Sequence, residues 1–429
     1  MKMNKRIMTG ILMALLTIGA YAQSGVMSPY SQFGLGALSD QSTGFSRGMN
    51  GVGLALHRGN VVNTLNPASY SAVDSLTMMF DLGLSGQITS FKEGNTRVNA
   101  RGGNFDYFAS SFRLMPQVGL AFGVLPVSKV DYHYSSTTFM GINYGNMENN
   151  FAGDGGLRKV FLGAGWRIVK PLSVGFNAAY LWGTIDHVST NVTSSSVKSL
   201  MKLYTASVSN YTLDLGLQYT QMLTKKDELT VGATVGIGHK LGTDAKCSFI
   251  TSDPVLVRSD TTSLVVSNAL QLPMTYGLGA ALNHDGRLFV GADFRLEKWG
   301  SVGYPVYNMD TNTFGVADNQ LKDRYSLNVG ADYVPNPMSR KLMDRIHYKA
   351  GAGFTTPYIK INGKDGPKEF SASVGFGIPL QNAYNNRSVL NISAQWSHAS
   401  ATGFVRENTF RISLGLTFNE RWFMKWKID

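Results

Sequence analysis

Apolar residues alternate with small or polar residues through most of this chain. In the stretch from Val160 to Ile168, Val, Leu, Ala, Trp and Ile occupy alternate positions, and Phe, two Gly and Arg lie between them. Because successive side chains of a β-strand point to opposite faces, this stretch predicts a strand with one apolar face. The same pattern recurs at residues 172–182, 213–219, 288–295, 325–333 and 410–418. The sequence therefore predicts an all-β protein.

Composition and charge agree with this class and exclude others. Charged residues make up 16% of the 429 residues, against about 25% in an ordinary soluble domain. Past residue 22 we find no uncharged apolar run of the roughly 18 residues that a membrane-spanning helix requires. The net charge of +11 includes Lys2, Lys5 and Arg6, which lie in a segment that we expect to be removed. The remaining positive charge is weak and scattered, whereas nucleic-acid binding needs clustered Lys and Arg, so we expect no nucleic-acid partner.

The N-terminus has the organisation of a cleavable signal peptide. Residues 1–6 are basic, residues 7–20 are apolar, and Ala20-Tyr21-Ala22 supplies the small residues of a cleavage site. We therefore predict a signal peptide at residues 1–22 and export of the mature chain. A short membrane anchor is the alternative, but the apolar run is too short for one. Cys247 is the only cysteine, which excludes an internal disulfide, and it does not lie near the cleavage site as in a lipid-anchored precursor.

Two architectures could bury the apolar faces of the strands. A soluble sandwich would pack them between two sheets, whereas a transmembrane barrel would turn them toward lipid and line its lumen with the polar faces. Many segments have the roughly 9–11 residues that a tilted strand needs to cross a bilayer. Aromatic residues near the segment ends suit the interfacial girdles of a barrel; they are Tyr180, Trp182, Tyr219, Tyr325, Tyr333, Trp396 and Phe418. We therefore predict a 14-stranded antiparallel transmembrane β-barrel over residues 75–418, closed because an open sheet edge is not tolerated in lipid.

The connections between these segments alternate in length. Short ones are expected at residues 116–117, 169–171, 224–227 and 283–286, and long ones include residues 136–156 and 188–202. Short periplasmic turns and long extracellular loops are typical of outer-membrane barrels. One exception is the long connection 336–346, in which we expect a helical turn at residues 342–346. Another irregularity is the segment 102–114, which alternates poorly, so its register stays open.

Residues 23–74 precede the first expected strand and do not alternate. They are rich in Gly, Ser and Asn. Their most distinctive positions are Gly48, Gly51 and Gly53, followed by Asn66, Pro67 and Ala68. This region resembles the N-terminal hatch of the long-chain fatty-acid transporter (FadL/OMPP1/TodX-type) family of outer-membrane proteins, as does the later stretch 153–157 of sequence Gly-Asp-Gly-Gly-Leu. The alternative is that Asn66-Pro67-Ala68 is only a turn before a strand.

The resemblance implies a fold and a function. Family members have fourteen strands, carry the hatch inside the lumen as a plug, and pass hydrophobic molecules inward without an energy source. The molecules leave sideways through a gap at a kinked third strand. The matching position here is Leu125-Pro126-Val127, because proline cannot donate to a strand ladder and belongs at edges or bulges. A proline at a strand end or in a harmless bulge is the alternative.

Catalytic and metal-binding patterns are absent from the sequence. None of the seven histidines has a zinc-ligand spacing to another His or Cys, and we find no phosphate-binding loop or serine nucleophile motif. We therefore predict no catalytic residues, metal or cofactor, with an outer-membrane phospholipase or protease as the enzyme alternative. Charged residues of the polar strand faces are expected to hold the plug in the lumen; they are Asp81, Asp214, Asp293, Asp332, Arg167, Arg295 and Arg411.

The C-terminus contains two further signals. Gly415, Leu416 and Phe418 resemble the aromatic-ended last-strand signal that the outer-membrane assembly machinery reads. The chain then continues through residues 419–429 as a periplasmic tail, in which Trp422, Phe423 and Trp426 lie beside basic residues. This composition suits the membrane interface, and a docking tail for another protein is the alternative.

Two functional hypotheses follow from these patterns. The first is a passive channel in the outer membrane of a Gram-negative bacterium, whose partners are membrane lipid, a hydrophobic small-molecule ligand and the assembly machinery that inserts it. The second is a non-transport barrel subunit of an envelope secretion or outer-membrane-protein assembly complex, with other envelope proteins as partners. A ligand-sized apolar cavity above the hatch would favour the channel, and a lumen filled by side chains would favour the subunit.

Overall fold

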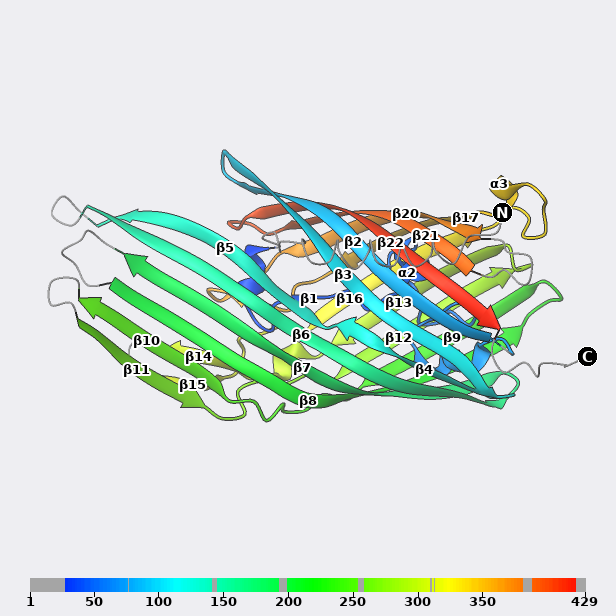
Figure 1. Ribbon diagram of the computed structural model, residues 1–429, viewed down its shortest axis with the longest axis horizontal. Helices are drawn as coiled ribbons and strands as arrows, with labels where there is room; N and C mark the ends of the chain where they lie inside the picture. The colour runs from blue at the N-terminus through cyan, green and yellow to red at the C-terminus, as the bar shows by residue number, and fades with distance from the viewer. Residues whose placement is uncertain are drawn as a thin grey trace, which may run out of the picture.

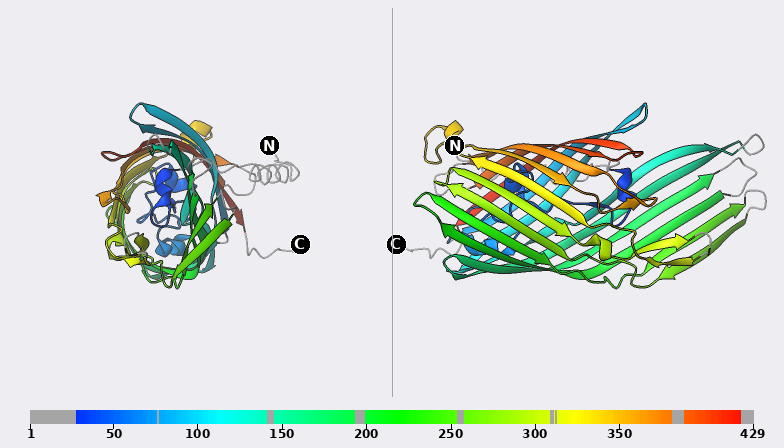
Figure 2. Two further views of the ribbon diagram at one scale, coloured as in Figure 1. Left: turned by 90° about the vertical axis from the view of Figure 1, so that its left-hand side faces the viewer. Right: turned by 180° about the vertical axis from the view of Figure 1, so that it is seen from behind.

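The computed structural model describes residues 28–75, 77–140, 145–192, 199–253, 258–308, 311, 313–380 and 388–421. Within these residues the chain forms a closed barrel of fourteen antiparallel strands (Figures 1 and 2), as predicted. The expected signal peptide at residues 1–22 and the side chains Trp422, Phe423 and Trp426 lie outside the described residues. None of the helices in the described part of the chain has the length and apolar character to cross a membrane.

The barrel strands follow the predicted segments closely. Eleven are single elements: β2 (Thr77–Glu93), β3 (Thr96–Met115), β6 (Asn146–Val169), β7 (Leu172–Val192), β8 (Ser199–Met222), β13 (Leu288–Glu297), β16 (Arg324–Tyr333), β17 (His347–Thr355), β20 (Lys368–Leu380), β21 (Ser388–Ser400) and β22 (Arg406–Arg421). Three consist of two pieces each, namely β4 (Val118–Pro126) with β5 (Ser128–Phe139), β9 (Asp227–Gly236) with β10 (Ala245–Asp253), and β11 (Arg258–Val266) with β12 (Thr275–His284). Small accessory strands are β1 (Ala37–Leu38), β14 (Tyr304–Asn308), β15 (Thr313–Ala317), β18 (Lys360–Ile361) and β19 (Lys364–Asp365).

The last strand closes the barrel on the first. Strand β22 pairs with β2 from Thr77↔Arg421 to Lys92↔Arg406. In hydrocarbon each unpaired backbone group costs several kcal/mol, so this continuous ladder removes an edge that the membrane would not tolerate. Strand β22 also extends past Phe418 to Arg421, so the ladder includes the first residues of the expected tail.

The two faces of the strands have opposite environments. Along β22, the side chains of Phe410, Ile412 and Leu414 are about half exposed, whereas Ser413 and Thr417 between and beyond them are buried in the interior. An outward apolar band with polar side chains inside is the arrangement of a transmembrane barrel, not of a sandwich. The predicted outward aromatic residues Tyr180 and Tyr219 are likewise exposed on this band.

Two predicted extracellular loops are instead continuations of strands. We expected loops at residues 136–156 and 188–202, but β5 runs to Phe139, β6 starts at Asn146, β7 runs to Val192 and β8 starts at Ser199. These Ser-, Thr- and Asn-rich stretches keep the ladder, and the resulting extension projects past the other strands at the left of Figure 1. The loop prediction is wrong here because polar composition alone does not exclude a strand, and Thr and other β-branched residues suit strands.

The poor alternation of the predicted segment 102–114 has a structural cause. The pairing of β2 with β3 shifts register between Gly83 and Leu84, which face Tyr107 and Phe105. Asp106 is therefore an extra residue, a β-bulge. Because of this bulge, both Asp106 and Tyr107 are buried on the lumenal side, while Phe105 is exposed on the outer face.

The connections at the end of the barrel away from the strand extensions are mostly short, as predicted. The long exception at residues 336–346 contains the expected helical turn, α3 (Leu342–Arg345). Since short turns face the periplasm in outer-membrane barrels, the β2–β3 hairpin and the strand extensions lie at the extracellular end.

Candidate functional site

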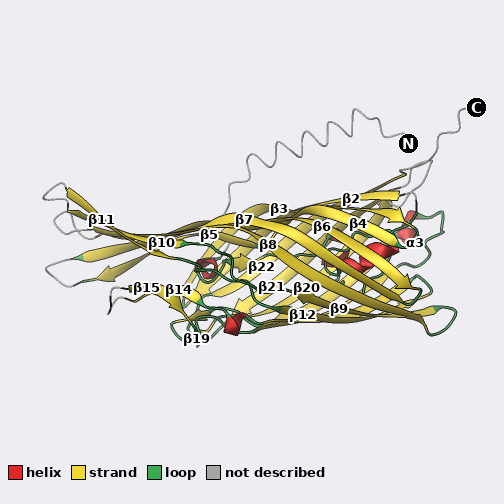
Figure 3. Cartoon of the chain, turned by 90° about the horizontal axis from the view of Figure 1, so that it is seen from below, coloured by secondary structure: helices red, strands yellow, loops and turns green. Residues whose placement is uncertain are grey.

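The N-terminal residues 28–75, here named the inner segment, lie inside the barrel. Figure 2 shows this segment in blue within the ring of strands, and Figure 3 shows its short helices enclosed by them. It contains η1 (Pro29–Gln32), α2 (Gly44–Arg47) and η2 (Pro67–Ala72). Most of its side chains between Ser42 and Ser71 are buried. The barrel thus has a filled interior along this segment.

The bulge of β3 holds the start of α2. Arg47 forms an ion pair with Asp106, and both side chains are nearly inaccessible to solvent. The hydroxyl of Tyr107 donates to Asp81 Oδ1 at 2.7 Å and accepts a hydrogen bond from the backbone N–H of Gly44. The residues Arg47, Asp106 and Tyr107 were not predicted from the sequence. The break in alternation at 105–107 is the signal that could have identified the last two.

A second carboxylate, from the other side of the barrel, holds the following turn. Asp293 on β13 accepts hydrogen bonds from the backbone N–H groups of Gly53 and Leu54 through Oδ2, at 2.7 and 2.9 Å. Its side chain is buried. Asp293 was expected to face the lumen and hold the plug, and the hydrogen bonds agree with that expectation.

The predicted glycines around this turn have distinct local roles. Gly51 has a φ of +79°, a conformation that favours glycine. A Cβ at Gly48 would lie 3.3 Å from Gly375 Cα on β20, so the two backbones pass close to each other here.

Asn66 organises the end of the inner segment. Its side chain is fully buried and its Oδ1 accepts from the backbone N–H of Ala68 at 3.1 Å, which caps η2 at Pro67. The same side chain donates through Nδ2 to the carbonyl oxygens of Leu54 at 2.8 Å and Leu217 at 3.1 Å. The Asn-Pro-Ala motif therefore does more than form a turn, because Asn66 joins two parts of the inner segment to strand β8.

Glycines of the barrel strands allow this close fit. A Cβ at Gly165 on β6 would lie 2.7 Å from the carbonyl oxygen of Pro67, and one at Gly330 on β16 would lie 2.6 Å from that of Met49. A Cβ at Gly232 on β9 would overlap the carbonyl oxygen of Leu54. Other strand glycines against the inner segment are Gly119, Gly175, Gly216, Gly351, Gly375 and Gly415. The backbone of the inner segment thus contacts the wall around most of its circumference.

Two further charged groups reach the inner segment from β16 and β17. Arg58 pairs with the fully buried Asp332 at 2.8 Å, and His347 contacts the same carboxylate at 2.9 Å. Lys349 donates through Nζ to the carbonyl oxygen of Phe45 at 3.0 Å and to Asn391 Oδ1 at 2.8 Å.

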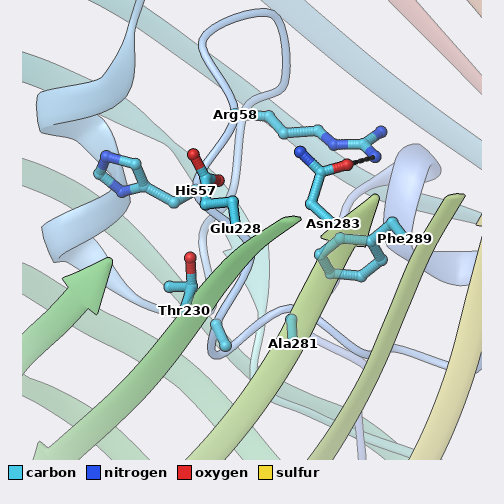
Figure 4. Close-up of a pocket in the computed structure, with 8 residues that line it drawn as sticks. His57, Arg58, Glu228, Thr230, Ala281, Asn283 and Phe289 are labelled. Atoms are coloured by element: carbon cyan, nitrogen blue, oxygen red, sulfur yellow. Dashed lines mark hydrogen bonds between the residues drawn. The ribbon is translucent and has the colours of Figure 1, made fainter. Parts of the chain in front are cut away.

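A small cavity lies beside these groups near the periplasmic end (Figure 4). It is lined by His57, Arg58, Glu228, Thr230, Ala281, Asn283, Phe289 and Ala55, and about 10 Å³ of its volume is open to water. Small-molecule sites are larger, roughly 300–1,000 Å³, and mostly apolar. A volume of about 10 Å³ is at the lower limit for a single water molecule, so this cavity is too small to be a site for a small-molecule ligand.

The wall changes direction at the predicted third-strand position. Strand β4 ends at Pro126 and β5 begins at Ser128. Pairing of β3 with β4 extends from Met115↔Val118 to Phe108↔Val124, and residues 96–107 of β3 have no ladder partner on that side among the described residues. The ladder between β3 and the third barrel strand (β4 with β5) is therefore interrupted beyond Phe108↔Val124. The ladder between this third strand and β6 breaks after Pro126↔Arg158 and resumes at Val130↔Gly155.

The neighbouring strand bends at the same level. Gly155 and Gly156 on β6 have φ values of +112° and +129°. The Gly-Asp-Gly-Gly-Leu stretch therefore supplies the backbone conformations that a bend beside Pro126 requires.

The inner segment covers the interrupted wall from inside. Strand β1 pairs with β5 through Ala37↔Lys129 and Leu38↔Ser128. The backbone N–H of Ser39 donates to the carbonyl oxygen of Val127 at 3.0 Å, and the Gln41 side chain donates to the carbonyl oxygen of Pro126. Leu125 is buried in an apolar cluster with Tyr70 and Val62. The described residues at the kink thus contact the inner segment.

The predicted last-strand residues lie in β22. A Cβ at Gly415 would lie 2.7 Å from Gly44 Cα, so this position also contacts the inner segment. Leu416 pairs with Leu82, and Phe418 pairs with Phe80. They lie in the ladder that closes the barrel.

The fold and its filled interior define an outer-membrane β-barrel of the FadL type that carries its own N-terminal segment in the lumen. The chain belongs to the BamG family, whose model matches residues 3–429. No curated protein shows significant sequence similarity to the chain.

Solved structures agree with this fold. The toluene transporter TodX of Pseudomonas putida has 15% identity and a TM-score of 0.59, over 91% of this chain and 100% of that chain. A FadL homologue of Pseudomonas aeruginosa has 12% identity and a TM-score of 0.59, over 92% and 99%. The Ralstonia pickettii toluene transporter TbuX has 15% identity and a TM-score of 0.56, over 91% and 100%. At these identities the likeness establishes the shared fold, which confirms the predicted FadL-type barrel.

Proposed function

We propose that this protein is a non-transport barrel subunit of an outer-membrane-protein assembly or secretion complex. The observation that carries the proposal is the set of buried charged contacts that attach the inner segment to opposite sides of the barrel wall. In this role residues 23–74 act as a permanent plug, so that the barrel serves as a scaffold with its outer surface and its extracellular extension available to partners.

The attachments of the inner segment argue against its ready displacement. Carboxylates on β3, β13 and β16 each bind it, through Arg47, through the N–H groups of Gly53 and Leu54, and through Arg58. Breaking a buried ion pair by removing one partner costs about 3–5 kcal/mol, and hydrogen bonds to charged groups contribute about 1.5–3 kcal/mol each. A transport cycle that moved this segment as a unit would have to break several such contacts together.

The shared fold does not by itself transfer a channel function to this chain. The family model that matches nearly the whole chain is BamG, a name distinct from those of the hydrocarbon and toluene channels that share the fold. Fold alone does not determine function, so the contents of the lumen are the better guide.

Purification from the native membrane tests the proposal. A C-terminally tagged copy, solubilised in mild detergent, is expected to elute with one or more other envelope proteins in a fixed ratio. An abundant unrelated barrel with the same tag, from the same cells, is the control. Depletion of the protein is expected to lower the levels of other outer-membrane proteins. A protein that elutes alone, with unchanged levels of other barrels after its depletion, would contradict the proposal.

The interrupted wall favours a second candidate, a channel for hydrophobic small molecules with a lateral exit at Leu125-Pro126-Val127. The gap between β3 and β5 supports it, and fold relatives include proteins described as toluene transporters. Liposomes that contain the purified protein would then take up radiolabelled toluene or oleate faster than liposomes that contain an unrelated barrel. Equal rates would exclude this candidate while leaving the subunit role untouched.

A further inference from the structure

The outer face of the β2–β3 hairpin and the adjoining end of β22 carries three cations in one row. Lys92 on β2 is paired with Arg97 on β3 and, on its other side, with Arg406 on β22. All three side chains are exposed. Residues directly opposite each other have Cβ atoms about 4.5–5.5 Å apart, and like charges in such positions destabilise a sheet. Folding alone therefore gives no reason for this row.

The nearby acidic residues do not neutralise the row. Glu93 and Glu407 directly follow Lys92 and Arg406 and so point to the opposite face of the sheet. Glu407 is engaged there by the hydroxyl of Ser28, which donates to it at 2.6 Å. Among the described residues, none of the three cations forms a salt bridge, and Arg97 donates only to the Ser90 hydroxyl, at 2.7 Å.

The rows below the cations change in the order that a membrane surface requires. The next row toward the membrane that shares this face contains Ser90, Asn99 and Asn408, which are polar and uncharged. The row below that contains Ile88 and Phe410, both about half exposed, with Arg101 beside them. Going from the hydrocarbon outward, the face thus passes from a row with two apolar side chains and one arginine, through an uncharged polar row, to a row of three cations.

The position of the hairpin directs this face toward lipid. Its tip stands outside the outline of the barrel in both end and side views (Figures 1 and 2). It is free to do so because β3 loses its partner β4 above Phe108. The cations lie on the outward face, the one that continues downward into the apolar band.

We propose that this row binds the phosphate of a phosphorylated lipid in the outer leaflet, with Lys92 in the centre and Arg97 and Arg406 on either side. A phosphate offers charged oxygens to several donors at once, and Arg is suited to bind two of them. The polar row would contact the backbone or sugar of the lipid, and Ile88 and Phe410 would contact its acyl chains. This inference does not depend on the subunit role, because any outer-membrane function leaves this face in contact with lipid.

Native mass spectrometry of the purified protein in detergent tests the assignment. The probes are lipid A, its dephosphorylated form and inorganic phosphate. The wild-type protein is expected to retain lipid A at a saturable site and to bind the dephosphorylated form at least tenfold more weakly. The variant K92Q/R97Q/R406Q is expected to lose at least tenfold in lipid A affinity. The matched control K225Q/K226Q/R287Q removes three charges at the opposite rim and is expected to bind as the wild type does.

Each other outcome overturns the proposal. Equal binding of lipid A to the two triple variants would mean that the row is not the site. Displacement of lipid A by inorganic phosphate at equal concentration would identify free phosphate, and not a lipid, as the ligand. If the triple variant fails to fold, as judged by the heat-dependent electrophoretic shift of a folded barrel, the single variant K92Q tests the same row. Removal of this central cation should still weaken lipid A binding several-fold. It should also raise the melting temperature in lipid-free detergent, because it relieves like-charge repulsion. Unchanged lipid A binding by K92Q would overturn the proposal.

Discussion

The ion pair between Arg47 and Asp106 offers a quantitative check on how the inner segment is held. The side chains are only 7% and 11% exposed, so replacing Arg47 by Met leaves a buried carboxylate without its cation. Loss of one partner of a buried pair costs about 3–5 kcal/mol. Ser85 still donates to Asp106 at 2.8 Å, which offsets part of the loss, so we expect the lower end, about 3 kcal/mol. At about 1.4 kcal/mol per factor of ten, this corresponds to a roughly 100-fold larger population of the locally detached state.

Hydrogen exchange measures that population directly. Backbone amides of residues 44–54 that exchange through local opening should exchange roughly 100-fold faster in Arg47→Met, while amides of the β2–β22 ladder stay unchanged. The variant R258M, which removes an exposed cation on β11, is the control and should leave both sets unchanged. The double variant R47M/D106N should recover part of the protection, because no unpaired charge remains. If R47M leaves residues 44–54 as protected as before, the ion pair does not hold the segment and the argument from buried charge fails.

Three other changes test separate contacts. Gly232→Val should reduce the yield of folded barrel, because the valine side chain would overlap the Leu54 carbonyl oxygen. The heat-dependent electrophoretic shift measures this yield. The control Gly315→Ala, at a position with open space around it, should have no effect. Tyr107→Phe should lower the free energy of local opening at the amides near Gly44 by about 1–3 kcal/mol. The reason is that it removes both the donor to Asp81 and the acceptor of the Gly44 N–H. An unchanged hydrogen-exchange profile would refute this. Cys247 is fully buried, so it should react with a maleimide far more slowly than a cysteine placed at the exposed position 98 in a C247S background, and equal rates would contradict the packing of β10.

Most of the barrel could be predicted because lipid and lumen impose opposite requirements on adjacent residues. The alternation at 410–418 or 325–333 records this directly, and the strands lie where the pattern indicates. The strand extensions could not be predicted in this way. Beyond the membrane neither face meets lipid, so Ser- and Thr-rich strands such as residues 136–139 lose the apolar signal and look like loops.

The contacts that hold the inner segment were harder to predict. Arg47 and Asp106 are 59 positions apart in sequence, and Lys349 reaches the Phe45 carbonyl group across 304 positions. No local pattern encodes such pairs. Asp293 was recognised only because a carboxylate on the polar face of a strand must point inward, and Asp106 was missed because a bulge reversed the phase of its strand. Functional residues in this fold therefore tend to lie where periodicity either places a charge inside or breaks down.

The arrangement of the anchors bears on what the barrel can do. The carboxylates of Asp293 and Asp332 lie on the neighbouring strands β13 and β16, whereas that of Asp106 lies on β3, on the other side of the barrel wall. A segment tied on one side only could swing as a lid about that attachment. One tied to well-separated strands cannot rotate away from any of them without straining or breaking the others, so its movement would require concerted loss of buried charge contacts. A barrel of this type keeps the fold of a channel but has its interior fixed, and its specific interactions are then expected on its outer and extracellular surfaces.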